Sequence, residues 1–268
     1  MRITVENANF HYKKGRKNLP NLYVNPINFS LDTGEVMAIL GPNGAGKTTM
    51  LKCITGLLNW TEGQTYIDGK PLTKINKRAL WKRIGYVPQA HKMVFGFSII
   101  ELVVMGRAPY ISTLSQPSKV DIEAAYEALT LVGIKHLANK TCNEVSGGEL
   151  QLALIARTLV SDPEVLILDE PESHLDIQKQ VVILQTIKQL AKERGISCII
   201  NTHYPNHAFY LADYVLMTAK EKEVVYGQVE AIMTEQRMKQ FFDVDVKKVI
   251  YEENDSIVQT MIPRALSK

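Results

Sequence analysis

The sequence reads Gly41-Pro42-Asn43-Gly44-Ala45-Gly46-Lys47-Thr48-Thr49 between an apolar run at 36–40 and a helix-forming stretch at 50–55. It fits the pattern G-x-x-x-x-G-K-[ST] from Gly41 to Thr48. The glycines let the backbone curl so that successive N–H groups point at an anion, and the helix that follows adds the positive end of its dipole. A glycine-rich turn with an incidental lysine is the alternative, and the flanking strand and helix argue against it. The pattern predicts a phosphate-binding loop in which Lys47 reaches the β- and γ-phosphates and the Thr48 hydroxyl ligates Mg²⁺.

Length and composition are those of an ordinary globular protein. The 268 residues suffice for a full core, and 31 basic against 28 acidic residues give a net charge of +3, which indicates no nucleic-acid partner. We expect Cys53, Cys142 and Cys198, which lack metal-ligand spacing, to be buried hydrophobic residues in a reducing compartment. The charged N-terminus predicts no signal peptide, and the longest apolar run, 94–105, is too short to span a membrane. A membrane role would then require a partner.

Hydrophobic periodicity predicts an α/β protein. Strands are expected at 3–5, 22–24, 27–31, 36–40, 84–87, 165–168, 197–201 and 214–218, and a strand and turn at 66–70. Helices are expected at 50–55, 121–132, 150–160, 176–194 and 205–211. The second of these helices carries Ile122, Ala125, Leu129 and Val132 on one face. The alternation favours a mainly parallel sheet, with 97–160 as a helical insertion.

The domain organisation that we expect is a single domain over residues 1–268. It comprises an N-terminal β subdomain with the glycine loop (1–88), a helical subdomain (89–162), the rest of the core (163–222) and an extension (223–268). The extension is expected to hold a hairpin, a helix at 234–242 and strands at 248–251 and 258–262.

Two carboxylates, Asp169 and Glu170, follow the apolar run at 165–168. Ligands of open α/β sheets bind at the carboxyl ends of the strands. An acidic pair after a strand is by itself usually only the start of a loop. Beside a phosphate loop, however, Asp169 can hold the Mg²⁺ shell and Glu170 can polarise an attacking water.

A second candidate anion site is Ser146-Gly147-Gly148-Glu149, which precedes a predicted helix. A serine hydroxyl, two bare backbone amides and a helix N-terminus could bind a phosphate, although the same residues could form an ordinary helix cap. One chain does not need two γ-phosphate sites, whereas two chains packed head to tail would use both.

In their order along the chain these motifs resemble the ATP-binding-cassette (ABC) family. The glycine loop is similar to Walker A, 145–149 to the LSGGQ signature, 165–170 to Walker B and Ser173-His174-Leu175-Asp176 to the D-loop. The resemblance implies a P-loop NTPase (RecA-like) core with an N-terminal antiparallel β subdomain and an inserted α-helical subdomain. It also implies ATP and Mg²⁺ as cofactors and ATP hydrolysis as the reaction.

Further residues gain roles only from this resemblance. Gln89 matches the Q-loop glutamine, an Mg²⁺ ligand and hinge to the helical block, and His203 matches the switch histidine. Tyr12 is similar to the aromatic residue that stacks on adenine, with Phe10 as the alternative. The implied catalytic set is Lys47, Gln89, Glu170 and His203, and the implied metal ligands are Thr48, Gln89 and Asp169. The implied nucleotide contacts are Tyr12, Gly41, Pro42, Asn43, Gly44, Ala45, Gly46, Lys47, Thr48, Thr49, Gln89, Ser146, Gly147, Gly148, Glu149, Asp169, Glu170, Asp176 and His203.

The chain departs from the family pattern in four places. Val145 replaces a leucine, Glu149 a glutamine and Glu172 a frequent threonine, while Tyr204 stands where an acidic residue is usual. None of these changes removes a phosphate or metal ligand, so we expect an active site with the full set of groups.

The stretch from Phe97 to Tyr110, which includes Gly106-Arg107-Ala108-Pro109-Tyr110, resembles the ATPases of iron-siderophore, haem and cobalamin importers. The tail resembles them too, through Val225-Tyr226-Gly227, a short helix, Phe242-Asp243-Val244 and a β-hairpin. Molybdate and tungstate importers, a non-transport cassette ATPase and an exporter cassette are the alternatives. The importer resemblance implies a homodimer of this subunit with two copies of a polytopic permease, an indirect substrate-binding protein and a place on the cytoplasmic face of the cell membrane. We expect a permease helix to dock on part of the apolar stretch 89–110, which includes Met93, Val94, Phe95, Phe97, Ile99 and Ile100. The cargo is not encoded in these motifs.

Overall fold

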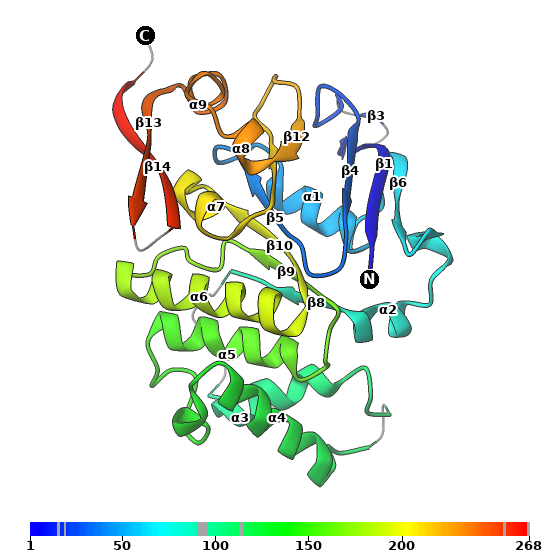
Figure 1. Ribbon diagram of the computed structural model, residues 1–268. Helices are drawn as coiled ribbons and strands as arrows, with labels where there is room; N and C mark the ends of the chain where they lie inside the picture. Colours follow the sequence, from blue (N-terminus) through cyan, green and yellow to red (C-terminus); the bar gives the residue numbers. More distant parts are fainter. Residues whose placement is uncertain (15–16, 19, 90–95, 113–114, 254–255, 267–268) are drawn as a thin grey trace. The chain divides into compact units, whose positions relative to one another are not determined.

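The structure is a computed structural model that describes residues 1–14, 17–18, 20–89, 96–112, 115–253 and 256–266 (Figure 1). It contains two compact units, Met1–Lys74 with Ile199–Lys268, and Ile75–Cys198. The expected four-part division of the chain therefore stays a proposal. Among these residues, no helix is both long and apolar enough to cross a membrane.

The first unit contains an antiparallel sheet in the order β4 (Ile27–Leu31), β1 (Ile3–Asn9), β6 (Glu62–Ile67) and β7 (Lys70–Pro71). Short strands β2 (Lys13–Lys14) and β3 (Lys17–Asn18) pair separately, and the turn η1 (Leu72–Lys74) follows β7. Alternate residues of β4 and of Ile3 to Val5 in β1 are buried, as period-2 patterning requires, and the alternation in β1 breaks at the register shift between Val5 and Ala8. The predicted strand at 22–24 is wrong. Asn9 explains this, because its side-chain amide accepts from the Tyr23 N–H and donates to the Tyr23 carbonyl, in place of a neighbouring strand.

The same unit also holds the central strand β5 (Val36–Leu40), whose five residues are all buried. β11 (Tyr214–Met217) pairs with β5 in parallel, and β12 (Val225–Gln228) pairs with β11 antiparallel. β10 (Ser197–Thr202), whose residues from Ile199 onward belong to this unit, is the neighbour of β5 on its other side. The helices are α1 (Lys47–Ile54), α7 (Pro205–Leu211), α8 (Val229–Ile232) and α9 (Glu235–Phe242). A hairpin of β13 (Val244–Glu253) and β14 (Ser256–Leu266) completes it, with strands longer than predicted.

The second unit pairs β8 (Ile84–Val87) in parallel with β9 (Val165–Asp169). Its helices are α2 (Lys77–Arg83), α3 (Ile99–Val104), α4 (Lys119–Leu131), α5 (Gly147–Leu159) and α6 (Ile177–Arg194), with short turns η2 (Met105–Arg107) and η3 (Lys135–Leu137). Sequence reasoning missed α2, whose charged sequence hides its period, although Asn76 caps it by accepting from the N–H groups of Arg78 and Ala79. The parallel core strands and the helical block predicted from the sequence are confirmed.

One predicted core position on α4 is wrong. Ala125 and Leu129 are buried, but Ile122 is 40 % exposed. Asp121 takes the buried place instead, because the Arg107 guanidinium donates to its carboxylate at 2.8 Å. An ion pair with additional hydrogen bonds permits a charged residue where the hydrophobic pattern favoured its neighbour.

Candidate functional site

The glycine loop has the curled backbone that its sequence predicts. Gly44 and Gly46 have φ of 80° and 88°, in the left-handed region that glycine tolerates best. A Cβ on Gly41 would lie 2.0 Å from the Thr218 carbonyl oxygen, so only glycine fits there. Helix α1 begins directly after Gly46 without a side-chain cap, and the N-terminus of a helix favours an anion.

Lys47 is buried within this loop, with 5 % of its surface exposed. Its ammonium donates to the carbonyls of Gly41 and Pro42, at 2.7 and 3.2 Å. The positive charge of Lys47 therefore lies against the backbone of the loop. Thr48 is exposed at the start of α1.

Tyr23 supports the glycine loop through a hydrogen bond, and sequence reasoning missed this residue. Its ring is 2 % exposed and its hydroxyl donates to the Gly46 carbonyl at 2.9 Å. A Cβ on Gly46 would also meet Leu22 at 2.7 Å. No local pattern marks this contact, because it joins positions 23 residues apart.

The structure separates the two aromatic candidates for adenine stacking. Phe10 is 7 % exposed and packs edge-on against Tyr12, whereas Tyr12 is 48 % exposed. The Tyr12 hydroxyl lies 2.7 Å from the Thr49 hydroxyl, at the edge of the glycine loop. Tyr12 is therefore the ring available to a ligand. His203, in the same unit, directly follows the last residue of β10.

The second unit carries the two carboxylates at the end of β9. Asp169 is 7 % exposed and accepts a hydrogen bond of 3.0 Å from the Tyr86 hydroxyl on β8. Burial, together with the Asp169 carboxylate, raises the pKa of the Tyr86 phenol, so it stays a donor across neutral pH. Tyr86 is a second residue that the motifs did not reveal, although it lies only three positions before Gln89.

Glu170 occupies an unusual backbone conformation, with φ of 48°. Such a φ in a residue other than glycine is uncommon and is often found at functional sites. Its carboxylate accepts from the Ser173 hydroxyl at 3.1 Å, which ties Walker B to the D-loop. Gln89 also contacts this loop, because its side-chain nitrogen lies 3.4 Å from Nδ1 of His174.

Two predicted ligand residues turn out to serve as helix caps. The Asp176 carboxylate accepts from the Lys179 N–H at 2.9 Å and so caps α6. The Glu149 carboxylate accepts from the N–H and hydroxyl of Ser146, both at 2.7 Å, at the start of α5. These bonds hold the pKa of Glu149 below its usual range.

The signature glycines are not explained by capping. Helices α3 and α4 have the same Ser–acidic capping box, formed by Ser98 with Glu101 and by Ser118 with Asp121, without any glycine at the next two positions. At the start of α5, a Cβ on Gly148 would meet the Lys179 side chain at 2.9 Å, so packing against α6 accounts for that glycine. A Cβ on Gly147 would meet only one Leu175 methyl, at 3.3 Å. Gly147 therefore leaves an accessible backbone for a ligand to approach.

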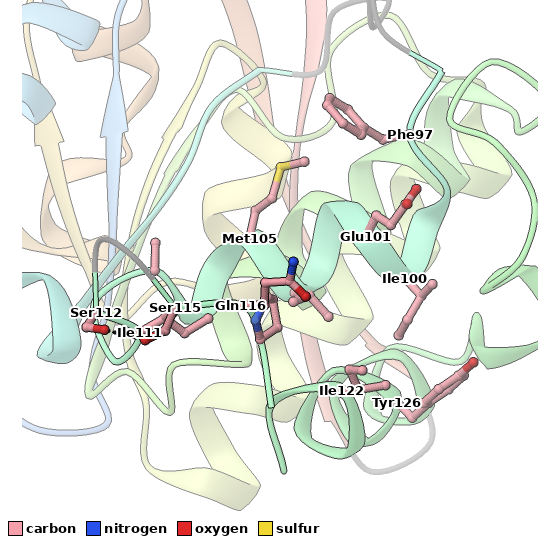
Figure 2. Close-up of a pocket in the computed structure, with 13 residues that line it drawn as sticks. Phe97, Ile100, Glu101, Met105, Ile111, Ser112, Ser115, Gln116, Ile122 and Tyr126 are labelled. Carbon is pink, nitrogen blue, oxygen red and sulfur yellow. Dashed lines mark hydrogen bonds between the residues drawn. The ribbon is translucent and has the colours of Figure 1, made fainter. Parts of the chain in front are cut away.

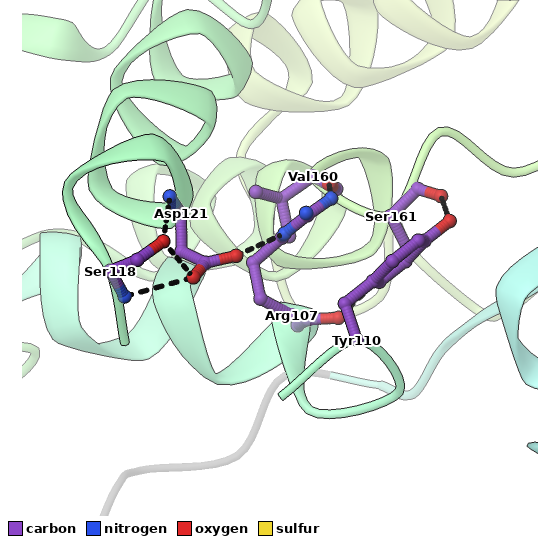
Figure 3. A network of polar contacts seen from close by, with 7 residues as sticks. Arg107, Tyr110, Ser118, Asp121, Val160 and Ser161 are labelled. Carbon is purple, nitrogen blue, oxygen red and sulfur yellow. Dashed lines mark hydrogen bonds and ion pairs between the residues drawn. The ribbon is translucent and has the colours of Figure 1, made fainter. Parts of the chain in front are cut away.

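The stretch 106–110 forms a structural clamp within the second unit (Figure 3). Arg107 binds Asp121 and donates to the Val160 carbonyl at 3.1 Å, and the Tyr110 hydroxyl donates to the Ser161 carbonyl at 3.0 Å. The Tyr110 ring makes cation–π contacts with two side chains. The guanidinium carbon of Arg107 lies 4.1 Å from the ring centroid, and the Lys82 ammonium lies 4.4 Å from it. These side chains join the end of α5 to the start of α4.

The sites expected from the sequence thus divide between the two units. The glycine loop, Tyr12 and His203 belong to the first, while Gln89, the signature, Asp169, Glu170 and Asp176 belong to the second. Met93, Val94 and Phe95 of the expected docking stretch lie outside the described residues. No group of three or more His, Cys, Asp or Glu side chains arranged for a metal occurs in the part of the chain that is described.

Known proteins resemble the chain over most of its length. The family model for the ABC transporter domain matches residues 24–173. A probable iron chelatin transport ATP-binding protein of Helicobacter pylori is 30 % identical over 97 % of this chain and 100 % of its own length. A molybdate import ATP-binding protein of Haemophilus influenzae is 30 % identical over 97 % and 96 %.

Solved structures agree with these relatives. A putative metal-chelate type ABC transporter, in an inward-facing conformation, matches with a TM-score of 0.85 and 28 % identity over 98 % of this chain and 96 % of that one. A dimeric ATP-binding cassette in a post-hydrolysis state with ADP and phosphate matches with a TM-score of 0.71 and 28 % identity, over 85 % and 98 %. The chain belongs to the ABC transporter family, as one of its ATP-binding, ATP-hydrolysing subunits.

Proposed function

We propose that this subunit hydrolyses ATP to drive the import of a metal chelate through a membrane permease, at whose cytoplasmic face it binds. The observation that carries this proposal is the extent of the structural likeness to a metal-chelate type transporter, which covers 98 % of the chain. That coverage extends beyond the ATP motifs to the clamp at 106–110 and the C-terminal hairpin. The iron chelatin relative from Helicobacter pylori supports the same cargo class.

In this proposal the nucleotide binds to the first unit along the glycine loop. Tyr12 stacks on the adenine with its exposed ring, and the amides from Gly41 to Thr49 hold the phosphates. Lys47 exchanges its two loop carbonyls for phosphate oxygens, which are stronger acceptors of a charge-assisted hydrogen bond. Binding of the anion then costs little rearrangement, because the ammonium is already inside the loop.

The residues present fit Mg²⁺. Thr48, Gln89 and Asp169 offer only oxygen ligands, and a single carboxylate together with substrate phosphates is how Mg²⁺ is usually held. One carboxylate among these three proposed ligands is the number that suits Mg²⁺. When bound, the ion would neutralise charge that develops on the phosphates.

Glu170 and His203 act on the attacking water in this proposal. Glu170 accepts the proton of the water, and its position is held by the left-handed backbone and the Ser173 hydroxyl. His203 donates a hydrogen bond to the γ-phosphate as charge builds there.

The signature would serve a second copy of the chain. The amides of Gly147 and Gly148 at the start of α5 form an anion site that one nucleotide in the same chain does not require. Glu149 and Asp176 then act as caps that fix these helix ends. The dimeric cassette that holds ADP and phosphate supports a homodimer.

A groove on the helical block is the proposed docking site for a cytoplasmic helix of the permease (Figure 2). It has a volume of about 840 Å³. Its lining is mostly apolar and includes Phe97, Ile100, Met105, Ile122 and Tyr126. Within it, Glu101 keeps its charge, because Ser98 holds the pKa of this carboxyl below its usual range. Ile99 of the expected stretch is core instead, with 0 % exposed. The groove therefore fits an amphipathic helix that carries a basic side chain.

Hydrolysis is tested by Glu170→Gln and Lys47→Ala. Glu170→Gln is expected to keep ATP binding while kcat falls by about 10²–10⁴-fold, since the amide cannot accept the proton. Lys47→Ala is expected to lose both binding and turnover. Wild-type turnover in the Glu170→Gln protein would contradict the role of Glu170.

Cargo is tested in proteoliposomes that contain the subunit, its permease and the binding protein. Stimulation of ATPase activity by iron chelates supports the proposal, whereas stimulation by molybdate or tungstate alone supports the second candidate. That candidate rests on the molybdate import relative, which matches over a similar length.

Docking is tested by Phe97→Asp, which is expected to abolish transport and leave ATP binding intact. Val120→Asp is the matched control, because Val120 lies on α4, is 66 % exposed and does not line the groove. Cysteines placed in the groove should cross-link to the permease. Cross-linking from another face of the subunit alone would refute the docking site.

A further inference from the structure

Three aromatic rings follow one another at the turn after β10. The ring centroids of His203 and Tyr204 are 4.1 Å apart with an interplanar angle of 37°, and those of Tyr204 and His207 are 4.8 Å apart at 42°. Tyr204 thus lies between two imidazoles. All three side chains are half-buried.

The position of Tyr204 is fixed by its own backbone. Its N–H donates to the Thr202 hydroxyl at 3.1 Å, and its carbonyl accepts from the His207 N–H at 3.1 Å. Pro205 at the first position of α7 restricts the chain further. These contacts fix the backbone of Tyr204 and leave its ring free to pack. The phenol ring can therefore restrict the orientation of the neighbouring imidazole. The Tyr204 hydroxyl has no hydrogen-bond partner among the residues described, so its contribution is made by the ring.

Helix α7 is in turn held by the C-terminal hairpin. The Asn206 side chain accepts from the Met261 N–H at 2.8 Å and donates to the Met261 carbonyl at 3.3 Å, as a neighbouring strand would. Nearby, the Lys248 ammonium lies 5.2 Å from the centroid of the Phe209 ring. β13 and β14 therefore brace the helix that begins two residues after His203.

We propose that Tyr204 is a positioning residue for His203. Its ring, backed by His207 and by the hairpin through Asn206, holds the imidazole in one orientation for the γ-phosphate. This rests on the proposed role of His203. The extension at 223–268, for which the ATP motifs offer no use, then has a function in catalysis.

The test measures kcat and KM for ATP in the full-length protein. Tyr204→Ala is expected to lower kcat by about two- to tenfold, the range set by one aromatic pair, with KM for ATP unchanged. Tyr204→Phe keeps the ring and is expected to retain wild-type kcat. Tyr251→Ala removes an exposed tyrosine from β13 and serves as the matched control.

A double-mutant cycle separates positioning from general stability. In the His203→Ala background, Tyr204→Ala should cause no further loss of kcat, because no imidazole remains to be oriented. Asn206→Ala should reproduce part of the Tyr204→Ala loss. The cycle uses the residual kcat of His203→Ala. If His203→Ala lowers kcat while Tyr204→Ala keeps full kcat, or if Tyr204→Ala lowers kcat by the same factor with and without His203, the inference is wrong. Full activity of His203→Ala would instead overturn the proposed role of His203.

Discussion

Tyr86→Phe removes the hydroxyl oxygen of a half-buried tyrosine in the second unit. In the wild type that oxygen donates to the Asp169 carboxylate at 3.0 Å, between two parallel strands. The phenylalanine ring keeps the same shape, so neither strand needs to move. Only the hydrogen bond to a nearly buried carboxylate is lost.

The expected cost is about 1.5 kcal/mol. Hydrogen bonds to charged groups contribute about 1.5–3 kcal/mol, and a length of 3.0 Å places this one at the weak end, because strong bonds from a hydroxyl to a carboxylate are shorter. For a chain of this size the loss corresponds to a fall in Tm of about 3–6 °C. Loss of a group that orients a metal ligand commonly lowers the affinity for the metal by about tenfold or more. The Mg²⁺ concentration for half-maximal ATPase activity should therefore rise by about tenfold.

Two measurements check this expectation. Thermal unfolding gives the change in Tm, and an Mg²⁺ titration of ATPase activity gives the half-maximal concentration. Tyr66→Phe is the matched control in the first unit, because the Tyr66 hydroxyl accepts a hydrogen bond of 2.7 Å from the neutral side-chain amide of Gln64 and does not serve a carboxylate. An unchanged Tm in Tyr86→Phe would refute the value assigned to the bond, and an unchanged Mg²⁺ requirement would refute its role in orienting Asp169.

Three further predictions concern stability and reactivity. Gly106→Ala would place a Cβ 1.8 Å from the Arg157 carbonyl oxygen. It should therefore lower the free energy of unfolding, measured in urea, by about 1–3 kcal/mol. Gly96→Ala is the control and should not lower it, because a Cβ on Gly96 would meet open space. Burial raises the pKa of Cys53 and Cys198 to about 12, so neither thiol should react with a disulfide reagent at pH 8 before the protein unfolds. Hydrogen bonds from Ser118, and then from Arg107, lower the pKa of Asp121 to about 2. The ionised carboxylate therefore stabilises the fold at pH values above the ordinary carboxyl pKa of 3.8, and this stabilisation is lost as the pH falls toward 2. The Tm difference between wild type and Asp121→Asn should accordingly be constant near neutral pH and shrink in acid.

The glycine loop could be predicted from the sequence because it is a local feature of the chain. A glycine loop needs only residues 41–49 in order, between a strand and a helix. The left-handed angles of Gly44 and Gly46 confirm that the backbone follows the expected curl. Strands β5 and β9 could likewise be found, since an uninterrupted apolar run has few other places in a folded chain.

Tertiary structure decided how the polar side chains are used. Glu149 and Asp176 matched ligand positions in sequence, yet their carboxylates cap helices α5 and α6. Asp121 displaced Ile122 from the buried face of α4 because Arg107, fourteen residues earlier, supplied the compensating charge. No local pattern reveals which partner a carboxylate will find.

The same distinction applies to the aromatic residues. Phe10 and Tyr12 are alike in sequence, and only burial made Tyr12 the exposed ring beside Thr49. Tyr23 and Tyr86 carry no motif, and each contacts a site residue only because the fold places that residue beside it. The role proposed for Tyr204 likewise depends on the rings that the fold places next to it. The sequence by itself determined the family and the phosphate loop, since these depend on short-range order. The orientation of the residues around them was settled only by packing, because hydrogen bonds and ring contacts form between whichever groups the completed fold brings together.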